Sequence, residues 1–215
     1  MLTIENAETF GWEAAIRGMR SPKNSWDKSD SCWSSPNENG TDKPMYIIGE
    51  NDLKLMHTLA AAGQDHGKFL RMIHVQLDVT APLYWHKEAD QYKVGTVTDS
   101  CSTMHKIHAK EFTLDDFSHE HLYSPLNDLK PTVDLLNVYR ERFLDTKDKE
   151  DWWQLIQLLP SSYNQRRTWD LNYAVLRNIY HARKGHRLDE WKTLLDWIET
   201  LPYAKELICS VGKNT

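Results

Sequence analysis

An alternating segment followed directly by a helix signal constrains this chain more than any other feature. Apolar residues alternate with polar ones from Ile73 to Val79, the period of two expected when one strand face is buried and the other is in water. Thr80 stands where an N-cap would, and Pro82 suits the first helical turn, where a missing N–H costs nothing. The pattern predicts a strand ending at Val79 and a helix over 83–90.

The segment after this helix is polar and rich in hydroxyl groups. It reads KVGTVTDSCSTMHK, from Lys93 to Lys106. Backbone N–H groups and hydroxyls of this kind suit a phosphate or a heterocycle, although no P-loop or GxGxxG spacing is present. A polar loop is the expected structure.

The rest of the chain predicts a helix-rich α+β fold with a small central sheet. A short extended piece, LTIEN, precedes a helix in which Phe10 faces inward, and residues 45–49 form a brief strand or turn. Residues 20–44 are polar and aperiodic, so we expect a long loop, held in place through Trp26 and Trp33. Further helices are expected at five places: from Asn51 as the cap to Gly63, from Pro131 over PTVDLLNVYRERFL, from Glu150 to Leu159, from Trp169 to Arg183, and from Leu188 to Leu201.

Length and charge limit the classes of protein to consider. The 215 residues fit one domain spanning 1–215. The net charge of −5 and the lack of a Lys/Arg tract argue against a dedicated nucleic-acid surface. With a mean hydropathy of −0.65 and no long apolar run, no transmembrane helix is expected. No secretory signal pattern opens the sequence.

The cysteines indicate a reducing compartment, and the histidines do not indicate a metal site. Three widely spaced cysteines suit the cytoplasm. Two close histidine pairs, at 105/108 and 119/121, lack the Cys pairs or HExxH spacing of known metal sites, so no metal ligand is predicted. Nine Trp and nine Tyr are explained by a core and a subunit interface, or by stacking on a ring-shaped ligand.

The strand, the Ala-Pro helix and the hydroxyl-rich loop together resemble the signature region of the flavin-dependent thymidylate synthases. That family has an Arg-His-Arg triplet after the helix and a Ser further on. Aligned on Ala81-Pro82, this chain has Gln91-Tyr92-Lys93 in place of the triplet and Cys101 in place of the Ser, flanked by Ser100 and Ser102. Lys93 keeps one positive charge, but as a point charge rather than a planar fork.

A second region carries the same resemblance. Residues 159–191 are similar to the family's late helix, in which an aliphatic face ends in an Arg followed by a His and an acidic residue. Here these would be Arg183, His186 and Glu190. In the family this arginine contacts and polarises the pyrimidine, so the resemblance assigns that role to Arg183.

The resemblance implies a thymidylate synthase-like fold and one-carbon transfer to dUMP or a related pyrimidine nucleotide. The implied cofactors are FAD, methylenetetrahydrofolate and NADPH, and the implied assembly is a homotetramer with sites between subunits. It assigns the catalytic role to Arg183 and places substrate at Ser100, Ser102, Lys106, Arg183 and His186. It places flavin at Lys87, Gln91, Tyr92, Lys93 and Asn172.

Other functional interpretations remain open. One is a nucleotide-binding or nucleotide-sequestering protein on the same scaffold that has lost flavin together with the triplet. Another is a purely structural protein, in which Arg183 pairs with Glu190 or another carboxylate. His86 and Asp90, four residues apart, are interpreted as a pair on a solvated helix face.

Overall fold

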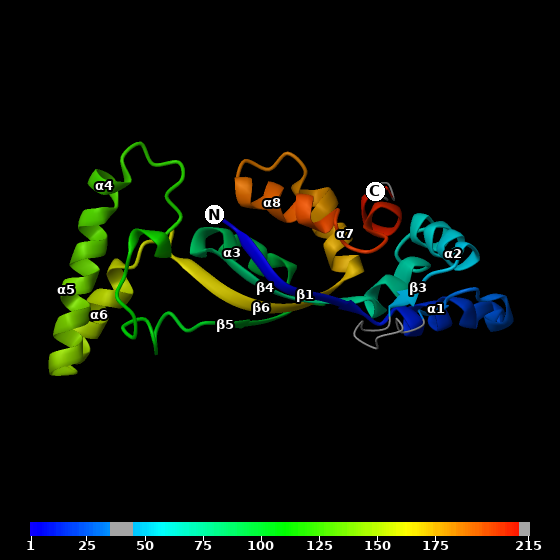
Figure 1. Cartoon of the computed structure of the whole chain (residues 1–215), viewed down its shortest axis with the longest axis horizontal. Coiled ribbons are helices and arrows are strands. Elements are labelled where there is room, and N and C mark those ends of the chain that lie inside the picture. Colours follow the sequence, from blue (N-terminus) through cyan, green and yellow to red (C-terminus); the bar gives the residue numbers. More distant parts are fainter. Residues whose placement is uncertain (35–44, 211–215) are drawn as a thin grey trace.

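The computed structural model describes residues 1–34 and 45–210. Its centre is a four-stranded antiparallel sheet with strand order β1-β4-β6-β5 (Figure 1). A separate two-stranded ribbon pairs β2 with β3. The strands are β1 (Thr3–Phe10), β2 (Cys32–Trp33), β3 (Tyr46–Ile47), β4 (His74–Pro82), β5 (Val97–Ser100) and β6 (Asn164–Asn172).

The helices gather in three places (Figure 1). One face of the sheet is covered by α3 (Leu83–Ala89), α7 (Tyr173–Arg183) and α8 (Asp189–Ile198). At one end lie α1 (Trp12–Arg20) and α2 (Glu50–Ala61), and at the other α4 (Pro125–Asp128), α5 (Lys130–Thr146) and α6 (Lys149–Leu158). Short 3-10 turns span Ser21–Lys23, Trp26–Lys28, Gly67–Met72, Asp90–Tyr92 and Leu114–Asp116, and a π turn spans Lys205–Cys209.

The pairing of β4 with β6 is the longest in the sheet. Its register runs without a break from His74 opposite Asn172 to Pro82 opposite Asn164. Paired apolar residues such as Val75 and Leu171 face the helices and are fully buried. Each strand is followed at once by a helix, β4 by α3 and β6 by α7. The predicted strand, the helix after it and the helix-rich α+β class are confirmed.

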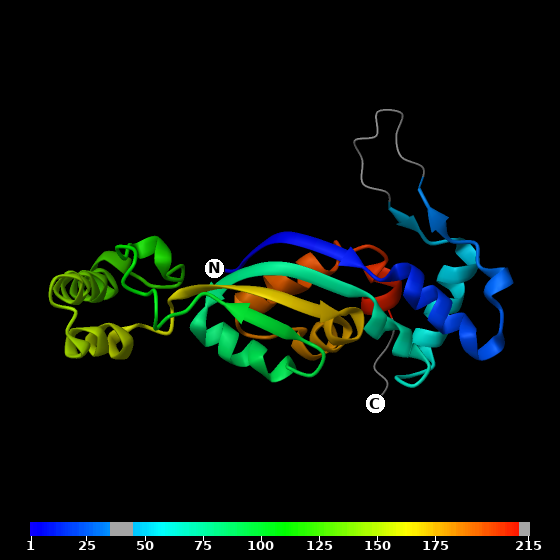
Figure 2. The ribbon, with the colours of Figure 1, turned by 90° about the horizontal axis from the view of Figure 1, so that it is seen from below.

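The other face of the sheet is polar. Figure 2 shows the strands side by side in front of the helices. On this face the Asp78 carboxylate accepts hydrogen bonds from Thr168 at 2.6 Å, Arg166 at 2.7 Å and Asn6 at 2.8 Å. These hydrogen bonds, from Thr168 first, hold the pKa of Asp78 well below its usual range. The polar half of the alternating pattern therefore forms a cross-strand network.

Two hydrophobic clusters form the interior. The larger lies between the sheet and its covering helices and extends to α1 and α2. The smaller lies among α5, α6 and residues 107–117, with Leu155 fully buried in it. Backbone hydrogen bonds connect the two regions, from Leu83 N–H to Tyr163 O at 3.0 Å and from Ser118 N–H to Ser162 O at 2.8 Å. The single-domain organisation remains a prediction.

The predicted helix from Trp169 to Arg183 is wrong at its start. Residues 169–172 belong to β6, and α7 begins at Tyr173, where the Asn172 side chain accepts the Val175 N–H at 3.1 Å. Gln165 and Arg167 interrupt the apolar alternation of β6, because they share the covered face with Trp169 and Leu171, and Arg167 pairs there with Asp90 at 2.6 Å. Hydrophobic alternation therefore does not predict this strand.

Two further segments predicted otherwise are strands. Residues 97–100 were expected to be loop but form the edge strand β5, whose four residues are all exposed and so carry no apolar alternation. Phe10 ends β1 rather than facing inward from a helix, and it is 41% exposed. A turn at Gly11 (φ 89°) separates β1 from α1, and a Cβ there would lie 2.0 Å from the Met72 carbonyl oxygen.

Both predicted helix caps are wrong. Thr80 stays in β4, because pairing with β6 continues to Pro82, which is the N-cap residue of α3. The helix α2 begins at Glu50, and the Asp30 carboxylate accepts the N–H groups of Asn51 at 2.9 Å and Asp52 at 3.0 Å. The cap therefore comes from a segment about twenty residues away, which no local pattern reveals.

Only part of the predicted loop over residues 20–44 lies within the described residues. Residues 21–34 form two 3-10 turns and β2, whereas residues 35–44 lie outside the described residues. Trp33 is held in place as expected, because its Nε1–H donates to Glu13 Oε2 at 3.2 Å. None of the helices in residues 1–34 and 45–210 has the length and apolar character that a membrane span requires.

His86 lies in the core rather than on a solvated face. It is fully buried, close to Trp85 and Trp169, and its Nε2 donates to the Gln165 carbonyl at 2.9 Å. Asp90, its expected partner, instead pairs with Arg167 at 2.6 Å. Burial lowers the pKa of His86 to about 4.

We predict that His86 makes folding stability depend on pH. Its folded-state pKa of about 4 lies below the ordinary 6.5, so the unfolded chain binds its proton first. Stability from this residue is complete above about pH 6.5 and falls by roughly 3 kcal/mol as the pH drops to about 4. Urea unfolding across this range should show that the free energy of unfolding depends less steeply on pH in His86→Gln than in wild type. The exposed control His57→Gln should keep the wild-type dependence; equal slopes for all three proteins would contradict the prediction.

We predict that Leu155→Ala lowers the free energy of unfolding by about 2–5 kcal/mol, because it leaves a cavity in the smaller cluster. The matched control is Leu158→Ala on the same helix, where Leu158 is 37% exposed, and it should cost less than about 1 kcal/mol. Urea unfolding followed by tryptophan fluorescence and circular dichroism measures both. If the chain is one domain, the two signals should change together, and separate transitions would overturn the single-domain prediction.

Candidate functional site

Five side chains converge where α3, α7 and α8 meet. Because β4 and β6 are antiparallel, α3 and α7 start at opposite ends of this strand pair and run back over the same face. Their last turns therefore come together beside α8. The cluster consists of Glu88, Tyr92, Arg183, His186 and Trp191.

Arg183 is held in one position by three neighbours. Its Nε donates to the Tyr92 hydroxyl at 2.8 Å, and its Nη1 lies 3.5 Å from Glu88 Oε2. The guanidinium carbon lies 4.5 Å from the centroid of the Trp191 ring and 5.4 Å from that of Tyr92, within cation–π range. Only 13% of the side chain is exposed. The arginine is thus preorganised before any ligand arrives.

Glu88 is the acceptor that joins the cluster. A single oxygen, Oε2, receives Trp191 Nε1–H at 3.2 Å and His186 Nε2 at 3.3 Å, besides Arg183. The other ring nitrogen of His186 accepts the Leu188 N–H at 3.2 Å, so the ring carries its proton on Nε2, toward Glu88. With 39% of the Glu88 side chain exposed, its ion pair contributes little to stability and mainly orients its partners.

The Nη2 edge of the Arg183 guanidinium remains available for chemistry. Within residues 1–34 and 45–210, no hydrogen bond or ion pair uses its Nη2. A guanidinium fixed in this way can donate to a carbonyl or phosphate oxygen without first losing side-chain freedom. The cluster can therefore bind and polarise a carbonyl-bearing ring.

A small cavity of about 50 Å³ adjoins the cluster through Tyr92. Lys93, Thr96, Thr98 and Trp169 also line it. Both Thr96 Oγ1 and Trp169 Nε1 are buried and have no hydrogen-bond partner in the described part of the chain. Buried polar groups normally find a partner, and this volume holds one or two waters or the end of a ligand group.

The residues assigned to the nucleotide phosphate lie along the edge strand β5 and beyond it. Ser100 is two residues from cavity-lining Thr98 and so points to the same face of the strand. Ser102 is engaged locally, where its hydroxyl accepts the N–H groups of residues 104 and 105, and Lys106 is exposed. Among the described residues, no hydrogen bond or ion pair joins these three side chains to Arg183.

The residues assigned to flavin do not form one site within the chain. Gln91 donates to the Glu88 carbonyl at 2.6 Å, Tyr92 is bound to Arg183, and Asn172 caps α7. Lys87 and Lys93 are exposed, and neither forms an ion pair with another described residue. Three of the five assigned side chains are thus engaged internally, and the set does not fit a flavin held by this chain alone.

The structural alternative paired Arg183 with Glu190 or another carboxylate, and the structure shows a pairing with another carboxylate. The partner is Glu88. Glu190 instead accepts a hydrogen bond from the Tyr84 hydroxyl and lies 3.9 Å from the N-terminal amine. The resemblance grouped Arg183, His186 and Glu190, but the structure brings only the first two to a common contact.

Sequence reasoning missed Glu88 and Trp191 as members of the cluster. Glu88 and Tyr92 are four residues apart, a spacing that places two side chains on one helix face, but nothing local shows that this face meets the end of α7. Across residues 1–34 and 45–210 there is no group of three or more His, Cys, Asp or Glu side chains arranged to hold a metal ion.

No protein-family model matches the sequence, and no curated protein matches it significantly. Solved structures do match over nearly the whole chain. Thymidylate synthase X from Helicobacter pylori, solved with FAD and dUMP, has a TM-score of 0.71 at 15% identity over 96% of this chain and 97% of its own. A second structure of that enzyme with FAD and dUMP has a TM-score of 0.64 at 15% identity, covering 98% and 99%.

A UMP/dUMP methylase from Streptomyces cacaoi, bound with 5-bromo-dUMP, is also similar, with a TM-score of 0.63 at 13% identity over 99% of this chain and 96% of its own. At such low identity the likeness reports on the fold rather than on individual side chains. The fold that the sequence resemblance predicted is confirmed: over nearly its whole length, the chain has the fold of the flavin-dependent thymidylate synthases.

Proposed function

We propose that this protein binds a pyrimidine nucleotide with the base against Arg183. The observation that carries the proposal is the fixed guanidinium, held by Glu88, Tyr92 and Trp191 with Nη2 left for a ligand. A uracil-type ring presents carbonyl oxygens that such a donor recognises, and Tyr92 and Trp191 add aromatic surface. Solved structures of the same fold are bound with dUMP or a bromo analogue of it.

The proposal assigns the phosphate to the β5 side of the site. Ser100 and Ser102 offer hydroxyl donors, and Lys93 and Lys106 offer exposed positive charges. His186 supports the base side indirectly through its contact with Glu88. Because these groups lie apart within one chain, we propose a homo-oligomer whose subunits complete the site together.

Two chemical outcomes fit this binding proposal. The enzyme candidate is one-carbon transfer to the pyrimidine, with Arg183 polarising the ring, reduced FAD supplying hydride, methylenetetrahydrofolate supplying carbon and NADPH as reductant. The second candidate is binding or sequestration of the nucleotide without flavin. The hydrogen bonds that Gln91, Tyr92 and Asn172 make within the chain favour the second, because they use polar atoms that a flavin would otherwise bind.

We predict that dUMP binds to the purified full-length protein and that Arg183→Gln weakens binding by roughly tenfold to a hundredfold, the effect of losing a charge-assisted hydrogen bond. Isothermal titration calorimetry measures the dissociation constants. The matched control is Arg187→Gln, four residues along and exposed, which should bind dUMP like wild type. Wild-type affinity in Arg183→Gln would refute the base-binding role of Arg183.

We predict that the protein purifies without visible absorption near 450 nm and does not keep FAD through gel filtration. The reason is that polar atoms of Gln91, Tyr92 and Asn172 are used within the chain, which leaves Lys87 and Lys93 as the assigned residues without an internal partner among the described residues. Absorption spectra before and after incubation with FAD test this. A yellow protein with stoichiometric flavin would instead support the enzyme candidate, and formation of dTMP from dUMP and methylenetetrahydrofolate would then be assayed.

A further inference from the structure

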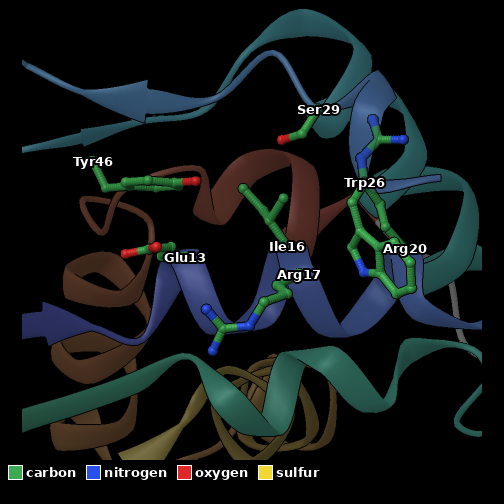
Figure 3. A pocket seen from close by; sticks show the side chains of 7 residues that line it. All are labelled: Glu13, Ile16, Arg17, Arg20, Trp26, Ser29 and Tyr46. Carbon is green, nitrogen blue, oxygen red and sulfur yellow. The ribbon is translucent and has the colours of Figure 1, made fainter. Parts of the chain in front are cut away.

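A cavity of about 310 Å³ between α1 and the chain leading into α2 has its buried polar groups satisfied. Figure 3 shows the side chains around it. In its wall, Arg20 Nε–H donates to the fully buried Asp52 at 2.6 Å, and Ser29 Oγ–H donates to the same carboxylate at 2.7 Å. Among the described residues, none that lines this cavity has a buried side-chain N or O atom without a partner. The other charges that line it, Glu13 and Arg17, have opposite signs, so they do not single out a ligand.

The smaller cavity beside Tyr92 differs, because two of its buried polar groups have no partner. Trp169, which is 3% exposed, and Thr96 both line it. Trp169 Nε1 and Thr96 Oγ1 are buried, and neither is hydrogen-bonded to any described residue. An indole N–H can only donate, and a threonine hydroxyl can donate as well. Buried donors need acceptors, so we expect the occupant of this cavity to supply an acceptor oxygen.

Both of these donors are held in place by their surroundings. The Trp169 ring stacks on Trp85, with ring centroids 5.6 Å apart and an interplanar angle of 11°. Thr96 follows Gly95, whose carbonyl accepts Asn172 Nδ2–H at 3.4 Å. A Cβ on Gly95 (φ 84°) would lie 3.1 Å from the same Nδ2, so this part of the chain packs directly against the start of α7. The donors are therefore preorganised for a ligand.

The rest of the lining favours a neutral occupant. Leu171 and Ile179 line the cavity and are 0% and 1% exposed. The two charged side chains that line it have opposite signs. Lys93 is exposed, and Asp90 is 53% exposed and pairs with Arg167 at 2.6 Å. These charges favour neither an anion nor a cation, and burial of a charge against the apolar wall would be costly.

We propose that this small cavity is a binding site for a neutral carbonyl group. The carbonyl oxygen accepts hydrogen bonds from Trp169 Nε1–H and Thr96 Oγ1–H, and the carbon atoms contact Leu171 and Ile179. A carbonyl oxygen has two lone pairs and, unlike water, no proton that needs an acceptor of its own. The volume of about 50 Å³ suits a group of a few atoms, such as an amide or a ketone. The site does not depend on a pyrimidine at Arg183.

The test uses three probes of nearly the same shape on the full-length protein. Acetamide is a neutral carbonyl compound, acetate is its anionic counterpart, and acetamidinium is a cation without an acceptor. The readout is the Trp169 Nε1–H resonance in ¹H–¹⁵N NMR spectra, identified by its absence from Trp169→Phe. We expect acetamide to shift it with a dissociation constant of about 1–10 mM. Acetate should bind roughly tenfold more weakly, and acetamidinium should leave the resonance in place.

A variant assigns binding to the cavity. Thr96→Val removes the hydroxyl and keeps the shape, so it should weaken acetamide roughly fivefold, the effect of one neutral hydrogen bond. The matched control Thr3→Val, exposed on β1, should bind acetamide like wild type. Equal affinity in wild type and Thr96→Val would overturn the proposal. So would a Trp169 resonance that acetamide leaves in place up to about 100 mM, because water alone would then fill the cavity.

A titration with dUMP separates two sources of the carbonyl group. If dUMP shifts the Trp169 resonance and blocks acetamide, the carbonyl belongs to the pyrimidine bound at Arg183. If acetamide binds equally with and without dUMP, the ligand is a separate small carbonyl compound. Both results support the carbonyl site and differ only in its ligand. Calorimetry measures dUMP binding independently, so failure of the pyrimidine proposal and failure of this one are distinguishable.

Discussion

The pairing of β4 with β6 is the interaction on which the rest of the structure depends. Its unbroken register gives the sheet one apolar face and one polar face, and each strand leads without a loop into a helix that packs on the apolar face. The two helices therefore arrive from opposite ends of the strand pair. A shift of one residue in this register would expose the buried face and separate Glu88 from Arg183.

Two carboxylates organise the polar contacts, with different consequences. Asp52 is fully buried and receives donors from α1 and from residues 29–31, so its main effect is to fix the chain before α2 against α1. Glu88 is partly exposed and gathers Arg183, His186 and Trp191 on one oxygen. Its pairing contributes little to stability but fixes the direction in which Arg183 points, which matters for a ligand rather than for folding.

The fold of the chain and the side chains at the triplet positions lead to different conclusions about flavin. Nearly the whole chain superimposes on a structure solved with FAD and dUMP, yet two of the three side chains in place of the flavin triplet, Gln91 and Tyr92, are used internally. A scaffold is maintained by its buried pairings, whereas a cofactor site depends on a few exposed side chains that can be replaced without loss of the fold. The preorganised Arg183 and the engaged Tyr92 are therefore compatible with a nucleotide site that has no flavin.

The sequence by itself determined the elements whose signal is local. The alternation ending at Val79 and the helix after Pro82 could be predicted because burial of one strand face leaves a period of two in the sequence. The strand β6 could not, because its charged residues find partners elsewhere in the chain, Arg166 with Asp78 and Arg167 with Asp90. Arg183 was identified through a resemblance, but its partner Glu88 was not, because only the tertiary structure brings the ends of α3 and α7 together, through a register set by residues far apart in the chain.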